Sequence, residues 1–175
     1  MVFLTIEEGP HPGLSRAELL RRARAVLRAL QLTHTELSIV LTKDDTLREL
    51  NRTYRNLDKP TDVLAFAMRE GEGPHLHEDI LGDIVVSVET ARAQADRHGH
   101  RVLDEVTMLM VHGTLHLLGW DHETRAKDVK MRAETARLCA LASRRRKPPS
   151  PRRRAGGPER RAGSLRLDGA KGGKP

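Results

Sequence analysis

Three histidines in the second half of the 175-residue chain have the spacing of a metal site. His112 and His116 lie four residues apart, so a helix would place them on one face, about 6 Å apart along its axis. Gly119 allows the chain to turn and bring His122 to the same point. Three neutral imidazoles with an open fourth position are typical of catalytic zinc. The sequence therefore predicts a metal ion held by the three, against the alternative of a chance cluster of packed histidines.

Gly113 stands where a related metal-binding pattern carries its general base. The three-histidine spacing matches His-Glu-x-x-His-x-x-Gly-x-x-His of metzincin peptidases, in which the Glu accepts the proton. A Gly inside a helix costs about 1 kcal/mol relative to Ala, so we expect Gly113 to serve close packing or substrate approach. Peptide hydrolysis by the usual route would lack its proton acceptor. The pattern thus favours a metal site and disfavours a peptidase.

The basic charge of the chain belongs to its C-terminal end. The formal net charge is +7, but residues 143–175 alone carry twelve Lys or Arg against two acidic residues. The remaining 19 basic and 22 acidic side chains leave residues 1–142 at −3. We therefore predict a domain over 1–142 and a disordered basic tail over 143–175, whose Arg/Pro/Gly composition buries little apolar area. Bulk charge does not make the domain a nucleic-acid binder.

Alternating hydrophobicity and capping residues outline the elements that must position the histidines. We expect four strands, the last of them central in the sheet, at 2–6, 36–42, 61–66 and 80–86. Helices are expected from the Ser15 cap to about 30, from an Asp44 or Asp45 cap to about 55, from the Ser87 cap to about 99, from Asp104 through His116, and after His122. The 71–78 segment is expected to be a solvated loop, with its His75 and His77 as an alternative accessory metal site.

Composition also indicates the cellular compartment of the protein. A single cysteine, Cys139, excludes an internal disulfide and fits a reducing cytoplasm; its apolar surroundings favour a buried thiol. The first residues lack the basic-then-apolar pattern of a signal peptide, and no apolar run approaches the length of a membrane span. We therefore expect a cytoplasmic protein with no membrane partner.

Several segments together resemble one family. Leu50–Arg55 (LNRTYR), Lys59–Phe66 (KPTDVLAF), Leu81–Ser87 (LGDIVVS) and His112–His122 (HGTLHLLGWDH) look like the YbeY family of bacterial metal-dependent endoribonucleases. The resemblance implies a single-domain, zincin-like α+β fold, in which a four-stranded mixed sheet packs with about five helices. Ala65 departs from the family pattern, which usually has Ser there. The basic tail is a second departure.

The same resemblance implies the activity and the site. It implies one Zn²⁺ per chain on His112, His116 and His122, with Arg55 handling RNA in a cleft. The implied substrate is single-stranded RNA, in late 3′-end maturation of small-subunit ribosomal RNA and in ribosome quality control, so ribosomal particles are expected partners. Asp121 precedes the third ligand and would either orient a ligand imidazole or cap the next helix. Asp62 and Asp83 are expected to be structural rather than proton acceptors.

Two other functions are compatible with the residues. A non-enzymatic ribosome assembly factor could use zinc only to hold the loop after Gly119. A hydrolase acting on another substrate class, such as an esterase or a peptidase, could use the same ion. Zinc-dependent RNA cleavage separates both from the endoribonuclease.

Overall fold

Alternating apolar residues in the strand segments form one sheet in the computed structural model, which describes residues 1–68 and 79–144. The strands are β1 (Val2–Ile6), β2 (Glu36–Thr42), β3 (Val63–Ala67) and β4 (Ile80–Ser87). The helices are α1 (Arg16–Ala29), α2 (Asp44–Arg55), α3 (Val88–His98), α4 (Val102–Leu117) and α5 (Arg125–Ser143). These described residues form the predicted α+β domain with a four-stranded sheet and five helices. None of their helices is both long and apolar enough to cross a membrane.

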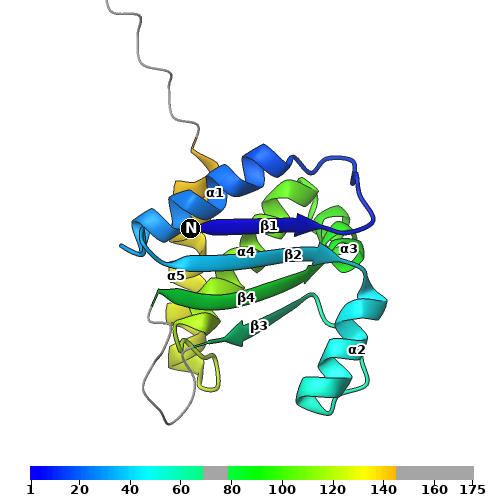
Figure 1. Cartoon of the computed structure of the whole chain (residues 1–175). Helices are drawn as coiled ribbons and strands as arrows, with labels where there is room; N and C mark the ends of the chain where they lie inside the picture. Colours follow the sequence, from blue (N-terminus) through cyan, green and yellow to red (C-terminus); the bar gives the residue numbers. More distant parts are fainter. Residues whose placement is uncertain (69–78, 145–175) are drawn as a thin grey trace, which may run out of the picture. The chain divides into compact units, whose positions relative to one another are not determined.

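The strand order is β1-β2-β4-β3. β1, β2 and β4 run parallel, and β3 pairs antiparallel with β4, so the predicted mixed sheet is confirmed. β4 is an inner strand, as its nearly continuous apolar sequence predicted. β2 precedes α2 and β4 precedes α3, and both helices begin at the same end of the sheet, as Figure 1 shows.

The main core lies between one face of the sheet and helices α1, α3, α4 and α5 (Figure 1). Alternate strand residues point into it, such as Leu37, Ile39 and Leu41 of β2. α4 is buried along most of its length, including Val106, Leu109, Met110 and Leu115, and forms the centre of the helical layer. The helix predicted to carry the metal ligands is therefore also the most deeply packed one.

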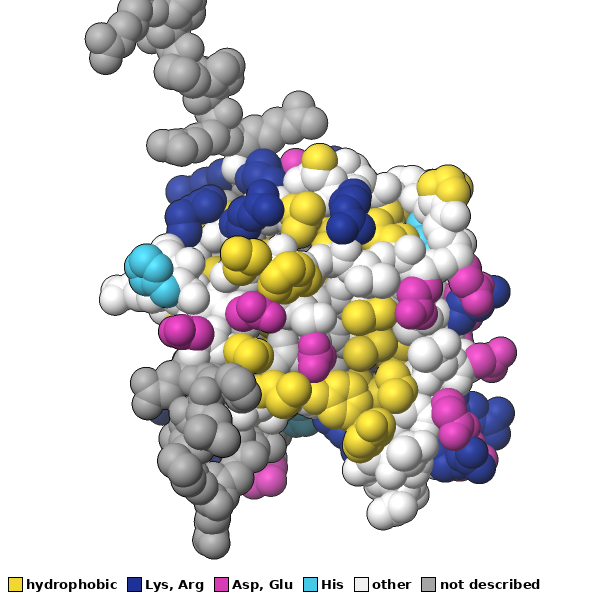
Figure 2. Space-filling view, viewed as in Figure 1, with side chains coloured by type: hydrophobic (Ala, Val, Ile, Leu, Met, Phe, Trp, Pro, Cys, Tyr) yellow, Lys and Arg dark blue, Asp and Glu magenta, His cyan; other side chains and the backbone are white. Residues whose placement is uncertain are grey.

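α2 packs on the opposite face of the sheet with a smaller core. Leu47 contacts Leu64 of β3 and Val85 of β4 there, and Tyr54 stacks edge-on against Phe66. Elsewhere on this face, Figure 2 shows hydrophobic and acidic side chains of the described residues interspersed. α2 is thus fixed beside β3, with its C-terminal end at Arg55.

Several helix boundaries follow the predicted caps, and one does not. Ser15 and Ser87 accept hydrogen bonds from the amides of Glu18 and Thr90 and begin α1 and α3. The predicted Asp44 or Asp45 cap of α2 is wrong, because Lys43 occupies the N-cap without a side-chain bond. The carboxylate of Asp44 instead accepts hydrogen bonds from the hydroxyls of Ser87 and Thr90 at the start of α3.

Two boundaries differ from those expected. β3 begins at Val63 rather than Thr61, because Asp62 turns its carboxylate back to accept a hydrogen bond from the Val63 amide. α4 begins at Val102, two residues before Asp104. The predicted loop 71–78, with its histidines, and residues 145–175 of the predicted tail 143–175 lie outside the described residues. Ser143, the first residue of that predicted tail, is the last residue of α5.

Candidate metal centre

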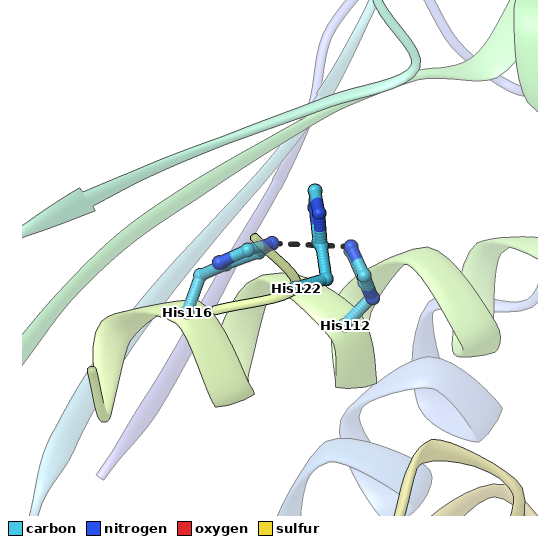
Figure 3. Close-up of side chains that lie close together, drawn as sticks. All are labelled: His112, His116 and His122. Atoms are coloured by element: carbon cyan, nitrogen blue, oxygen red, sulfur yellow. Dashed lines mark hydrogen bonds between the residues drawn. The ribbon is translucent and has the colours of Figure 1, made fainter. Parts of the chain in front are cut away.

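His112 and His116 face each other on α4. Their Nε2 atoms are 3.1 Å apart, and the two rings meet edge to face with centroids 4.6 Å apart. Figure 3 shows the two side chains rising from the same side of the helix with His122 between them. This is the juxtaposition that a four-residue helical spacing produces. The distance is close to the roughly 3.3 Å between two nitrogens bound about 2 Å from a tetrahedral ion.

His122 reaches the pair because α4 ends sharply. Gly119 has φ +78°, and its amide and that of Trp120 donate to the carbonyls of His116 and Leu115. This paired closure is a Schellman motif, in which a glycine takes the left-handed position. The turn brings the His122 ring to 5.8 Å from that of His112 and 5.3 Å from that of His116, centroid to centroid.

Gly113 provides close packing between α4 and the sheet. A Cβ atom built there would lie 3.0 Å from Cγ2 of Ile84 on β4. Gly113 is buried and also lines the cavity beside the histidines. The missing side chain therefore lets α4 approach β4 at the level of the ligands, which favours the packing role expected for this glycine.

Burial keeps the facing histidines neutral. The pKa of His112 is lowered from its ordinary value of 6.5 by desolvation first, and then by the neighbouring His116 and His122. The pKa of His116 is also lowered, chiefly by desolvation, although a hydrogen bond with the Trp120 backbone acts in the opposite direction. Only neutral imidazole binds a metal, so burial prepares both rings as ligands at neutral pH.

The donor set fits a zinc ion. One ring nitrogen from each histidine lies within 4.8 Å of the others. Among the described residues, no fourth His, Cys, Asp or Glu joins this group. Three imidazoles and one remaining position are the arrangement of catalytic rather than structural zinc sites. His122 is exposed and the other two are half-buried, so an ion could reach the three rings from solvent.

Asp121 holds the loop that carries His122. Its carboxylate accepts a hydrogen bond from the Glu123 amide at 3.2 Å and pairs with Lys127 Nζ at 2.6 Å. The Lys127 contact is the main reason that the pKa of Asp121 is lowered. α5 is capped by Thr124 instead. Asp121 thus acts on the backbone of the loop and on α5, and within the described residues its hydrogen bonds and its ion pair do not involve an imidazole.

The histidines open into a cavity of about 1100 Å³. Arg55 reaches its edge from the C-terminal end of α2, where Asn56 ends the helix in the left-handed conformation. Arg55 makes no hydrogen bond or ion pair with the part of the chain that the structure describes, yet its charge helps to lower the pKa of His116. The structure therefore places the predicted arginine beside the predicted metal ligands with its guanidinium available.

Asp62, which directly precedes β3, and Asp83 of β4 lie in different surroundings. Asp62 lines the cavity, but its carboxylate is engaged by the Val63 amide and the Gln94 side chain at 2.9 and 3.0 Å. Asp83 points to the α2 side, because it alternates with the core residues Ile84 and Val86. Asp83 is therefore remote from the cluster, and Asp62 has a structural bonding pattern.

α5 contributes cavity residues that the sequence analysis did not single out. Asp128 and Arg132 line the cavity and form an ion pair with each other at 2.8 Å. Their i,i+4 spacing was visible in the sequence, but such a pair ordinarily marks a solvated helix face. Only the packing of α5 against α4 shows that this face borders a cavity.

Three histidines at the mouth of a cleft in an α+β domain form the donor arrangement of metal-dependent hydrolases. The model of the family described as Endoribonuclease YbeY matches residues 13–142. A relative of that name from Heliobacterium modesticaldum is 50% identical over 110 residues, which span 58% of this chain and 66% of that protein. Another, from Geobacter sulfurreducens, is 37% identical over 142 residues, or 80% of this chain and 94% of that protein.

A solved structure also resembles the chain. The solution structure of a Thermotoga maritima protein superposes with a TM-score of 0.58 and 25% identity, over 81% of this chain and 89% of that one. The chain belongs to the endoribonuclease YbeY family, and the resemblance inferred from its motifs is confirmed. The predicted enzyme class, a metal-dependent endoribonuclease, is confirmed at the level of that family.

Proposed function

We propose that this chain is a zinc-dependent endoribonuclease specific for single-stranded RNA, acting in the cytoplasm on the 3′ end of small-subunit ribosomal RNA and in ribosome quality control. The single observation that carries the chemistry is the convergence of His112, His116 and His122 at the cavity that Arg55 borders. Family membership supports RNA as the substrate.

The three histidines would hold one Zn²⁺. When bound, such an ion supplies Lewis-acid polarisation of a phosphoryl oxygen and of water. The chain's own contribution is to keep two of the rings neutral through burial and to fix the third through the Gly119 turn. Lys127 and Asp121 hold the loop between that turn and α5, so the donor geometry is set before an ion arrives.

Arg55 would bind the scissile phosphate. Its planar guanidinium can make two parallel hydrogen bonds to phosphate oxygens and offset charge that develops during cleavage. Both other arginines of α2 are engaged: Arg48 pairs with Asp58 and Arg52 with Glu49. Arg55 has no such carboxylate partner among the described residues and lies on the cavity edge. It is therefore the arginine of α2 suited to a ligand.

The charge distribution suggests how RNA is recruited. Residues 1–142 carry a net −3, so the domain offers RNA little general attraction. We propose that 1–142 is the catalytic domain and that efficient cleavage needs RNA docked on a ribosomal particle. The basic residues 143–175 would then either add sequence-independent phosphate contacts or form only a solvated extension.

The test is cleavage by the full chain of a small-subunit ribosomal RNA 3′ precursor. The substrate is offered as single strand, as a matched duplex, and within the small ribosomal particle. We expect cleavage of the unpaired segment only, fastest within the particle, lost after chelation and restored by Zn²⁺. Activity that survives metal removal would refute the mechanism. Many turnovers on naked single strands would refute the docking requirement. Zinc binding and particle binding without cleavage would favour the assembly factor.

A further inference from the structure

A second group of potential metal ligands lies where α3 meets α4. His98 is the last residue of α3, and Gly99, with φ +70°, turns the chain so that His100 follows on the same side. Glu105 lies in the first turn of α4. One ligand atom from each of these three side chains lies within 4.8 Å of the others. The two imidazole rings are 5.6 Å apart and inclined by 30°.

Glu105 is a buried carboxylate with an incomplete set of partners. The residue is 1% exposed. Its Oε2 atom contacts His100 Nε2, while its Oε1 atom is buried with no hydrogen-bond partner in the described part of the chain. A buried, unpaired charged oxygen costs free energy unless another group compensates it. The position of Glu105 therefore indicates a further positive partner.

Nearby arginines do not supply that partner. Arg101 pairs with Asp104 at 2.8 Å. Arg22, itself 2% exposed, bonds Asp104, Glu18 and the hydroxyl of Thr107. Both guanidiniums are thus directed at other acceptors. The side chains that do turn toward Glu105 are the imidazoles of His98 and His100.

We propose that His98, His100 and Glu105 form a second metal site, which takes a divalent transition ion such as Zn²⁺. Two imidazoles and a carboxylate are a common zinc donor set, and tetrahedral zinc needs its ligand atoms roughly 3.3 Å apart. Both histidines are exposed, so the ion can enter from solvent and small rotations of His98 can close the remaining distance. The ion would satisfy the buried Glu105 oxygen and tie the end of α3 to the start of α4.

This site is separate from the first cluster. Glu105 precedes His112 by seven residues, which is about 10 Å along a helix. None of the three residues lines the cavity that contains His112 and Arg55. The second ion would therefore stabilise the helix that carries two ligands of the first site, without contacting substrate.

The test measures Zn²⁺ binding to the full chain by calorimetry in a His112→Ala/His116→Ala background. Folding is checked by circular dichroism. We expect one ion still to bind, and His98→Gln to weaken its affinity about tenfold or more, because one of three protein ligands is lost. His98→Gln leaves the His100–Glu105 contact intact, so it distinguishes a metal site from a simple ion pair. His34→Gln, which changes another exposed histidine outside both clusters, is the matched control and should change nothing.

A second measurement uses the wild-type chain and needs no substitution in α4. Two-bond ¹H–¹⁵N spectra report the ring nitrogens of His98 and His100 as Zn²⁺ is added beyond the first equivalent. We expect both rings to shift as the second equivalent binds. Unchanged rings, or equal affinities for His98→Gln and His34→Gln, would overturn the proposal. RNA cleavage is not a readout, so loss of the proposed function would leave this result unaffected.

Discussion

The two histidine clusters, each with at least one member on α4, differ in charge and in access. The first, His112, His116 and His122, offers three imidazoles and opens into a cavity bordered by Arg55. The second, His98, His100 and Glu105, includes a buried carboxylate and lies outside that cavity. Neutral donors leave a divalent ion its full charge, whereas a carboxylate offsets part of it. Similar ligand geometry thus suits catalysis at the first cluster and stabilisation at the second.

The largest effect should come from removing a ligand of the first cluster. His116→Ala is expected to abolish tight zinc binding there and to reduce RNA cleavage to background, because the ion loses one of its three protein ligands. Metal analysis and a gel assay of cleavage measure the two effects. His34→Ala is the matched control. If His116→Ala retains zinc-dependent cleavage, the first cluster is not the catalytic metal site, and its proposed difference from the second cluster is lost.

Arg55→Ala should separate cleavage from zinc binding. We expect cleavage to fall about 100-fold, the loss typical when one group that stabilises developing charge is removed, with zinc content unchanged. Arg55→Lys should recover only part of the rate, because an ammonium lacks the planar fork. Arg52→Ala, which loses only an exposed pair with Glu49, is the control. Equal rates for Arg55→Ala and Arg52→Ala would mean that the cavity edge does not bind phosphate.

Low pH should reduce both the stability of the metal-free fold and the zinc affinity of the first cluster. Because burial lowers the pKa of His112 and His116 below 6.5, the folded metal-free state binds protons less tightly than the unfolded state. Its free energy of unfolding should be unaffected above that pH and should decrease as the pH falls below 6.5. Zinc affinity should fall over the same range through proton competition. Denaturant unfolding and calorimetry between pH 5 and 8 measure both; a flat profile would contradict the burial argument.

Gly113→Ala tests the packing that places the first cluster. The added methyl would meet Ile84 at 3.0 Å, so we expect a loss of about 1–3 kcal/mol in the free energy of unfolding, as for other overpacked cores. Urea denaturation measures this loss. The exposed Gly99 has no atom within 4 Å of a built Cβ but has a positive φ, so Gly99→Ala reports backbone strain alone. A neutral Gly113→Ala would show that α4 can move away from β4.

The smallest effect concerns the second cluster. In the His112→Ala/His116→Ala background, Zn²⁺ at tenfold above its dissociation constant should stabilise the fold by about 1.4 kcal/mol, or a few degrees in melting temperature. His98→Gln should remove most of this gain, whereas His34→Gln should keep it. Differential scanning calorimetry with and without Zn²⁺ measures the shift. If Zn²⁺ does not raise the melting temperature of the His112→Ala/His116→Ala variant, the second cluster does not bind the ion.

Local patterns were sufficient for the first cluster's geometry and for the strand segments. The four-residue spacing of His112 and His116 and the glycine at 119 act within two helical turns, so neighbouring residues alone decide where the rings point. The same holds for the serine caps and for the alternation that assigns each strand residue to a face. These features depend on sequence separations of a few residues. The mixed sheet, which is confirmed, was implied by the family resemblance and not by these local patterns.

Only the tertiary structure decided which polar side chains acquire partners or lose water. Asp44 was expected to cap its own helix but bonds to the start of α3, 43 and 46 residues away in sequence. The sequence did not predict the cluster of His98, His100 and Glu105, because its potential as a metal site depends on the burial of Glu105 under the packed helices. Desolvation and long-range pairing depend on the whole fold, whereas helical spacing and caps depend on adjacent residues. That physical difference separates what the chain's sequence determined from what its folding added.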